Sequence, residues 1–174
     1  GNYGNIENTG IEVSLNTHPI TGQFQWDSDF QISFNKNKLK GLSGTSNAQI
    51  VGYGQWTDVV SVSSVGESLY NFYGYVCDGV YKDYDDLLNS PKPEKYPADG
   101  VFNRTNTVWV GDLKYKDLSG PDGKPDGVIN EYDKTNIGSP MPDFTFGWTN
   151  TFRYKNFDLS VFINGSYGNK VFNY

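Results

Sequence analysis

The fold is decided by the stretch Pro142-Asp-Phe-Thr-Phe-Gly-Trp-Thr-Asn-Thr-Phe-Arg-Tyr-Lys-Asn-Phe-Asp-Leu-Ser-Val-Phe-Ile-Asn-Gly-Ser166, which predicts two β-strands joined by a short turn. Side chains alternate across a strand, so each run has one apolar and one polar face. The apolar faces carry Phe144, Phe146, Trp148, Phe152 and Tyr154, then Phe157, Leu159, Val161 and Ile163. The polar faces carry Thr, Ser, Asn, Asp and Arg, with Phe162 as an exception. The turn falls at Tyr154–Phe157.

A half-buried sheet of a soluble protein gives the same alternation, and that alternative stays open at this point. Three details favour a membrane strand. Aromatic residues gather at the turn end, where a lipid-facing strand meets the headgroups. The polar side chains suit a water-filled interior, and each run has about the 9–11 residues that a tilted strand needs to cross a bilayer.

A second hairpin of the same design is predicted near the start of the chain. Residues 10–17 alternate, the segment His18–Gly22 contains the Pro and Gly of a turn, and residues 24–34 alternate again with Ser28 as an interruption. Asp27 and Asp29 share the polar face, where a dry core would make them costly. If both hairpins cross a membrane, their short turns mark the periplasmic side, and the chain divides into a barrel hairpin at 1–36, a mainly extracellular region at 37–142 and a barrel hairpin at 143–174. Any further crossings between the hairpins must be even in number, because both short turns lie on one side.

Composition excludes several classes of function. The net charge of −6 argues against nucleic acid, whose phosphates attract basic proteins. With one cysteine, Cys77, and one histidine, His18, the chain cannot build a zinc site or a Cys–His dyad in the usual way, and His18 is expected to be an exposed loop residue. We therefore expect no catalysis that depends on zinc or on a Cys–His pair. The opening at Gly1 and the end at Tyr174 suggest a piece of a longer protein.

One loop has the spacing of a metal site. The segment Asp117–Asp133 is rich in Asp and Gly, and a calcium loop would place its ligands at Asp122, Asp126, the Val128 carbonyl, Asn130 and Asp133. Gly127 falls at the tight turn. Lys124 occupies a position where an oxygen is usual, and Asp133 is shorter than the usual Glu. The alternative is a solvated Asp-Gly turn cluster.

A family resemblance rests on motifs that come in a fixed order along nearly the whole chain. They are Ile6–Thr17, Asp29–Lys38, Val65–Tyr75, Gly111–Asp117, Asp126–Asn130, Ile137–Gly147, Tyr154–Ser160 and Gly165–Gly168. Together they resemble the C-terminal barrel region of the SusC/RagA-type TonB-dependent outer-membrane transporters of Bacteroidota. The fold class is then all-β, with antiparallel strands forming part of a transmembrane barrel with long extracellular loops.

The resemblance implies a plugged barrel of about 22 strands in the bacterial outer membrane. Its implied partners are a SusD-like surface lipoprotein, the remainder of the barrel and its plug, and the TonB complex, and its implied cargo is a glycan or peptide. Five loop aromatics are candidates to face substrate or partner: Tyr53, Trp56, Tyr73, Tyr75 and Trp109. Glu12, Asp27, Asp29 and Arg153 would line the lumen. The main alternative is a soluble carbohydrate-binding β-sandwich with a structural calcium loop, and a third is a glycoside hydrolase with paired carboxylates.

Overall fold

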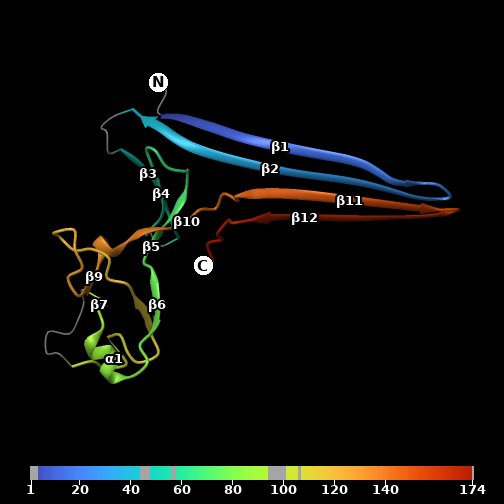
Figure 1. Ribbon diagram of the computed structural model, residues 1–174. Coiled ribbons are helices and arrows are strands. Elements are labelled where there is room, and N and C mark those ends of the chain that lie inside the picture. The colour runs from blue at the N-terminus through green and yellow to red at the C-terminus, as the bar shows by residue number, and fades with distance from the viewer. Residues whose placement is uncertain (1–3, 44–47, 56–57, 94–100, 106, 174) are drawn as a thin grey trace. The chain divides into compact units, whose positions relative to one another are not determined.

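A computed structural model describes residues 4–43, 48–55, 58–93, 101–105 and 107–173 (Figure 1). The elements, in chain order, are β1 (Gly4–Thr21), β2 (Phe24–Leu42), β3 (Gln49–Tyr53), β4 (Val59–Ser64), β5 (Asn71–Gly74), β6 (Cys77–Val80), α1 (Tyr84–Asn89), β7 (Lys92–Pro93), β8 (Leu113–Tyr115), β9 (Val128–Ile129), the 3-10 turn η1 (Glu131–Asp133), β10 (Thr135–Gly138), β11 (Phe144–Tyr154) and β12 (Phe157–Tyr167). The chain forms two compact units, one made of residues 1–52, 61–71 and 138–174 and the other of residues 53–60 and 72–137. No helix in the described ranges has the length and apolar character to cross a membrane.

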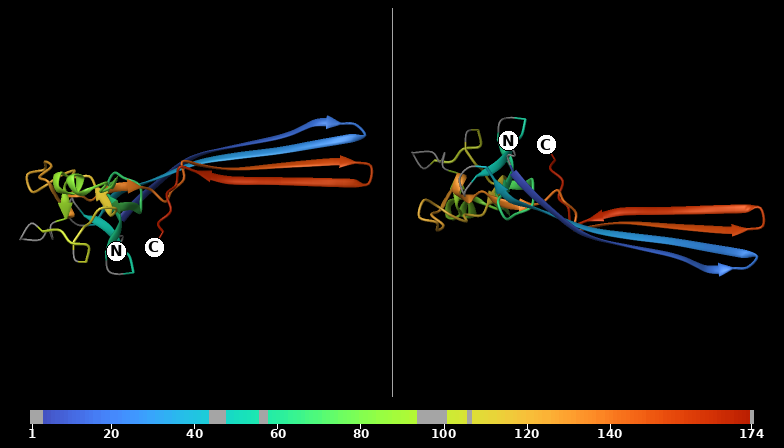
Figure 2. Two further views of the ribbon diagram at one scale, coloured as in Figure 1. Left: turned by 90° about the horizontal axis from the view of Figure 1, so that it is seen from below. Right: turned by 90° about the horizontal axis from the view of Figure 1, so that it is seen from above.

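The first unit is built on an antiparallel four-stranded sheet in the order β1-β2-β11-β12. Both predicted hairpins are confirmed, and β2 pairs directly with β11, so two segments more than 100 residues apart in sequence lie side by side (Figures 1 and 2). The register pairs Phe30 with Trp148 and Ser33 with Thr145. Both hairpin turns lie at one end of the sheet, so the chain between β2 and β11 leaves and returns at the other end.

One face of this sheet is apolar and open. Side chains from all four strands contribute, and many are exposed in the described part of the chain: Ile11, Val13, Leu15, Phe34, Trp148, Phe157, Leu159 and Ile163. Ile11 is 67% exposed and Phe157 is 79% exposed, values that a soluble sheet would hide under a second layer. The face is bordered at the turn end by Phe24, Trp26 and Phe152, whose rings stack at 6.0–6.2 Å.

A second aromatic row borders the same face at the opposite end. Phe144 lies 5.8 Å from Phe34 and 5.3 Å from Tyr167, measured between ring centroids. Ten residues separate Phe24 from Phe34 along β2, which corresponds to about 33 Å of strand. A strand tilt of about 40° reduces this to about 25 Å across the bilayer, the height of the apolar band on an outer-membrane barrel. The two rows therefore match the two interfaces of a membrane.

The interruptions in the two apolar runs coincide in space. Ser28 of β2 pairs with Asn150 of β11, and Thr17 of β1 continues the row. The Trp26 indole N–H donates to Asn150 Oδ1 at 3.0 Å, and the Trp148 indole N–H donates to Ser28 Oγ at 2.9 Å. Ser28 and Asn150 are therefore buried although they lie on an open face. The indole N–H groups of Trp26 and Trp148, which flank this short polar row, thus satisfy its hydrogen-bonding groups inside the apolar band.

The structure corrects the predicted first turn. His18, Pro19 and Ile20 belong to β1 rather than to a loop, and the turn lies later, between Thr21 and Phe24. The pairing shifts between Thr17 and Ile20, which marks a bulge. Proline has no N–H for a ladder and is tolerated at such bulges, so the Pro signal marked an irregular strand. At its other end β2 runs on to Leu42, past the predicted boundary at residue 36, and the division into membrane and loop regions stays a prediction.

The second unit has a small core of its own. Tyr81, Leu87 and Phe102 are almost completely buried, and Val108 and Trp109 pack against them. Leu87 comes from α1, and the Asp83 side chain caps α1 by accepting from the Asp86 N–H at 2.8 Å. Strand β6 pairs with β8, and β7 pairs with β9.

Candidate functional site

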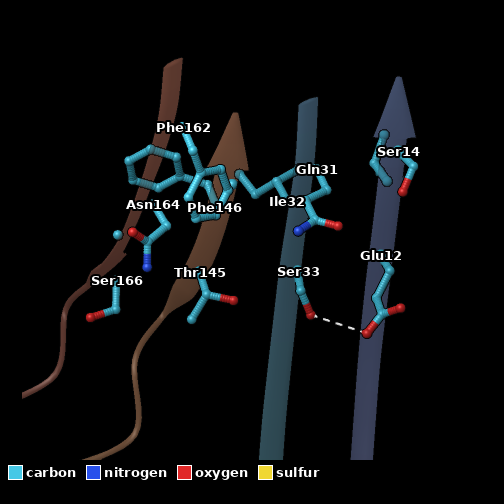
Figure 3. Close-up of a pocket in the computed structure, with 13 residues that line it drawn as sticks. Glu12, Ser14, Gln31, Ile32, Ser33, Thr145, Phe146, Phe162, Asn164 and Ser166 are labelled. Atoms are coloured by element: carbon cyan, nitrogen blue, oxygen red, sulfur yellow. Dashed lines mark hydrogen bonds between the residues drawn. The ribbon is translucent and has the colours of Figure 1, made fainter. Parts of the chain in front are cut away.

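The polar face of the four-stranded sheet carries the charged and hydrogen-bonding groups of the first unit. The register aligns its positions in rows across all four strands, one row being Glu12, Ser33, Thr145 and Ser166 (Figure 3). The next row is Ser14, Gln31, Gly147 and Asn164. Ser33 Oγ donates to Glu12 Oε1 at 3.4 Å. The rows line a shallow hollow of about 680 Å³.

Glycine shapes this hollow at one position. A Cβ on Gly147 would approach within 2.9 Å of the Gln31 side-chain nitrogen, so glycine leaves space for the Gln31 side chain on this face. Phe162, the exception in the sequence pattern, also lines the hollow and is 62% exposed. The hollow thus combines hydroxyl, amide and carboxylate groups with one aromatic ring, a set that suits a hydrated path for polar solutes.

A charged cluster lies on the same face near the turns. Asp27 accepts a hydrogen bond from Arg153 at 2.6 Å, and its other oxygen lies 2.6 Å from His18 Nδ1. Arg153 also lies 3.6 Å from Asp158. Glu12 and Asp29 share this face by register, so the structure brings the four residues predicted to line the lumen onto one surface. His18 lies on the same surface. The sequence did not predict this, because residues 18–22 were predicted to form a turn.

The acidic loop of the second unit is held together by hydrogen bonds from its backbone N–H groups to its own carboxylates. The Asp133 carboxylate is fully buried and accepts from the N–H groups of Leu118, Ser119 and Asn130 at 2.7–3.2 Å. Asp117 accepts from the Gly127 N–H at 2.5 Å. Burial alone would raise the pKa of Asp133, but these backbone donors outweigh it and lower the pKa below its ordinary value.

Two of the five predicted calcium ligands already accept backbone hydrogen bonds. Asp126 Oδ1 accepts from the Val128 N–H at 3.0 Å, and Asn130 Oδ1 accepts from the Tyr132 N–H at 3.0 Å. Asp122 is exposed. No cluster of three or more His, Cys, Asp or Glu side chains suited to a metal occurs in the described ranges. Such a cluster would contain only His, Cys, Asp and Glu side chains, whereas two of the predicted ligands are the Asn130 side-chain amide and the Val128 carbonyl oxygen. Calcium binding therefore stays a prediction.

The predicted loop aromatics have different environments. Tyr53 is 64% exposed. Tyr73 is half-buried, and Tyr75 packs at 5.3 Å against Tyr115 with Lys134 Nζ over its ring. Trp109 packs on the small core, and Trp56 lies outside the described residues. The predicted role of these five residues stays a prediction.

Trp109 also lines a hollow on the surface of the second unit. The hollow measures about 510 Å³ and is lined by Arg104, Trp109, Val110, Gly111 and Asp112. Asp112 is positioned by accepting from the Trp109 N–H at 2.8 Å. An aromatic ring beside a guanidinium group and a carboxylate provides one stacking surface and two hydrogen-bonding groups. Sequence reasoning missed Arg104 because no periodic pattern surrounds it.

Comparison with known proteins places the chain in a family. No family model matches it. It is 36% identical to TonB-dependent receptor P26 and 35% identical to TonB-dependent receptor P3, both of Formosa agariphila, over 99% of this chain and 16% of each relative. It is 27% identical to TonB-dependent receptor SusC of Bacteroides thetaiotaomicron over 98% of this chain and 15% of that protein. The chain thus spans about a sixth of the length of these relatives. With its antiparallel sheet and its apolar face between two aromatic rows, the chain belongs to the SusC-type TonB-dependent receptors.

Proposed function

We propose that the chain supplies four neighbouring wall strands and part of the extracellular loop layer of an outer-membrane importer for glycans or peptides. One observation carries the proposal. The apolar face of β1, β2, β11 and β12 is open and is bordered by aromatic rows about one bilayer apart. The apolar face then contacts lipid, and the polar face lines the hydrated interior of the barrel.

The polar face supports a transport role without catalysis. Its hydroxyl and amide groups offer many weak hydrogen bonds, which let a polar solute pass without being held tightly. Its charged cluster, in which Asp27 bridges His18 and Arg153, lies near the turns. Short turns mark the periplasmic side of outer-membrane barrels. The cluster would therefore face the plug near the periplasmic mouth.

The loop region supports a recognition role. The hollow beside Arg104, Trp109 and Asp112 offers a stacking ring and charged hydrogen-bonding groups. Exposed Tyr53 offers a second ring. A SusD-like lipoprotein and the TonB complex are the partners that this function would require. The soluble β-sandwich alternative would need a second protein layer over side chains such as Ile11 and Phe157, which are exposed in the described ranges.

Cysteine labelling of the intact receptor tests the proposal. Exposed Cys77 is first replaced by serine. Single cysteines are then placed on the polar face at Ser14 or Asn164 and on the apolar face at Leu15 or Ile163. We expect a water-soluble maleimide to label the polar positions rapidly and the apolar positions at least about tenfold more slowly in the membrane. Equal labelling of both sets would contradict the proposal. Growth of a receptor deletion strain on individual polysaccharides and peptides then identifies the cargo.

A further inference from the structure

Three lysines stand out near the end of β2. The segment Asn35-Lys-Asn-Lys-Leu-Lys40 holds three of the 14 Lys and Arg residues of a chain whose net charge is −6. All three lysines are exposed. In the described part of the chain, Lys36 and Lys38 have no ion-pair partner, so their charges are available to a ligand.

The lysines lie on the lipid-facing side of the strand. Side chains two residues apart share a face, so Lys36 and Lys38 follow Phe34 on the apolar side. The register pairs Lys38 with Glu7 and Lys36 with Thr9. Lys40 reaches Glu7 at 3.0 Å across a bulge, which places it on this face as well. Glu7 therefore neutralises one lysine and leaves the other two.

The strand extension that carries the lysines is held firmly from its other side. Leu39 is completely buried, its N–H donates to Glu67 O at 2.9 Å, and its carbonyl accepts from the Gly66 N–H at 2.7 Å. The Asn37 side chain accepts from the Leu69 N–H at 2.8 Å. Alternate residues are thus fixed inward while the three lysines project outward at a defined height. The backbone therefore needs little ordering when a ligand binds, and the entropy cost is limited to the lysine side chains.

The height of the lysines corresponds to the headgroup region. Phe34 belongs to the aromatic row with Phe144 and Tyr167, far from the short turns. Lys36 lies about 7 Å and Lys38 about 13 Å further along the strand. If the turns are periplasmic, as the proposed function requires, this is the outer surface of the membrane. Lipid phosphates occupy the layer just beyond the aromatic belt.

We propose that Lys36 and Lys38 form a binding site for the phosphate groups of outer-leaflet lipid headgroups on the outer wall of the barrel. The inference rests on the orientation in the proposed function. Ammonium groups bind phosphate as compact point charges, and clusters of lysine at a membrane surface attract anionic headgroups. The continuous apolar surface below Phe34 would hold the acyl chains of the same lipid.

The test uses the intact receptor in neutral detergent micelles. Lipid A with its phosphates is titrated in, and the bound fraction is measured by native mass spectrometry. Removing two lysines by Lys36→Gln and Lys38→Gln is expected to weaken binding about 30-fold, since each lysine near an anionic surface contributes about a factor of five. The matched control is Lys82→Gln with Lys124→Gln, two exposed lysines of the second unit, and it should leave binding unchanged.

Two further arms identify the ligand. Dephosphorylated lipid A should bind the unmodified receptor as weakly as phosphorylated lipid A binds the double variant. Inorganic phosphate at the same concentration should not displace the lipid, because it lacks the acyl contact. Equal binding by the double variant, or displacement by inorganic phosphate, would overturn the inference. Cysteine labelling of the same receptor distinguishes a failure of the lipid site from a failure of the proposed function. If the polar positions are labelled faster than the apolar ones but lipid binding does not depend on the lysines, only the lipid-site inference is contradicted.

Discussion

Replacing Asn150 by leucine tests whether the polar row inside the apolar band is held by its indole partner. Asn150 is 6% exposed and accepts from the Trp26 indole N–H at 3.0 Å. Leucine keeps the branched shape of asparagine and is bulkier, so the change removes the acceptor and adds some volume. The Trp26 N–H then has no partner in an environment without water. We propose a double-mutant cycle with Trp26→Phe, which removes the donor.

The expected magnitude follows from the setting of the bond. Leaving a buried donor unsatisfied costs about 1–3 kcal/mol. Hydrogen bonds between side chains inside membranes average about 0.6 kcal/mol in such cycles and reach about 1.7 kcal/mol. Asn150 is almost fully covered and the distance is short, so we expect a coupling energy of about 1 kcal/mol between Asn150→Leu and Trp26→Phe. Trp26→Phe should therefore offset much of the cost of the leucine.

The assay is guanidinium unfolding of the intact receptor from liposomes, with the four variants compared at the barrel transition. A control cycle pairs Asn150→Leu with Phe144→Leu, about 20 Å away along β11. Distant sites add to within about 0.5 kcal/mol, so this control should show no coupling. If the cycle of Asn150→Leu with Trp26→Phe also shows no coupling energy, the Trp26–Asn150 hydrogen bond does not stabilise the polar row. A second cycle, Ser28→Ala with Trp148→Phe, repeats the test on the other indole bond at 2.9 Å.

Three other predictions concern the second unit. Asp133→Asn should speed hydrogen exchange of the loop amides at 117–133 about tenfold or more, because the carboxylate accepts three backbone N–H bonds, whereas exposed Asp122→Asn should change nothing. The lowered pKa of Asp133 means that its contribution is complete above its unfolded pKa of about 3.9 and is lost as the pH falls through the folded pKa, so the protection factors of these amides should fall in the acid range, and protection factors that do not fall below that pH would contradict this role. If calcium binds, titration calorimetry of the intact receptor should show heat that Asp122→Asn with Asp126→Asn abolishes, and no heat at millimolar calcium would end that prediction. Arg104→Ala should weaken cargo binding about tenfold while leaving the thermal midpoint within a degree, and unchanged affinity would exclude the hollow from recognition.

The strands and their faces could be predicted from the sequence because alternation is a local property. Period-2 patterning is present in each strand separately, and it predicted both hairpins and the polar face that holds Glu12, Asp27, Asp29 and Arg153. The direct pairing of β2 with β11 could not be predicted, since their register depends on strands more than 100 residues apart. The same limit hid the second aromatic row, because Phe34 and Phe144 adjoin only after β2 and β11 pair.

The site was less predictable than the fold for a physical reason. A proline in a hairpin pattern is consistent with a turn or with a bulged strand, and only the pairing across Thr17 to Ile20 decides between them. The position of His18 beside Asp27 could therefore not be predicted from the sequence. In the acidic loop, spacing alone cannot distinguish a carboxylate that binds a cation from one that accepts backbone N–H groups. Asp133 does the latter in this structure.

The two polar features on the lipid side follow from one rule about strands in a bilayer. A polar side chain on this face must either be satisfied by a neighbour or lie where lipid headgroups satisfy it. Ser28 and Asn150 lie between the aromatic rows, next to the row at the turn end, and each receives an indole N–H. Lys36 and Lys38 lie beyond the outer row without an ion-pair partner in the described ranges, at the level where water and headgroup phosphates can satisfy them. Position relative to the two aromatic rows therefore separates a polar residue that stabilises the wall from one that binds lipid.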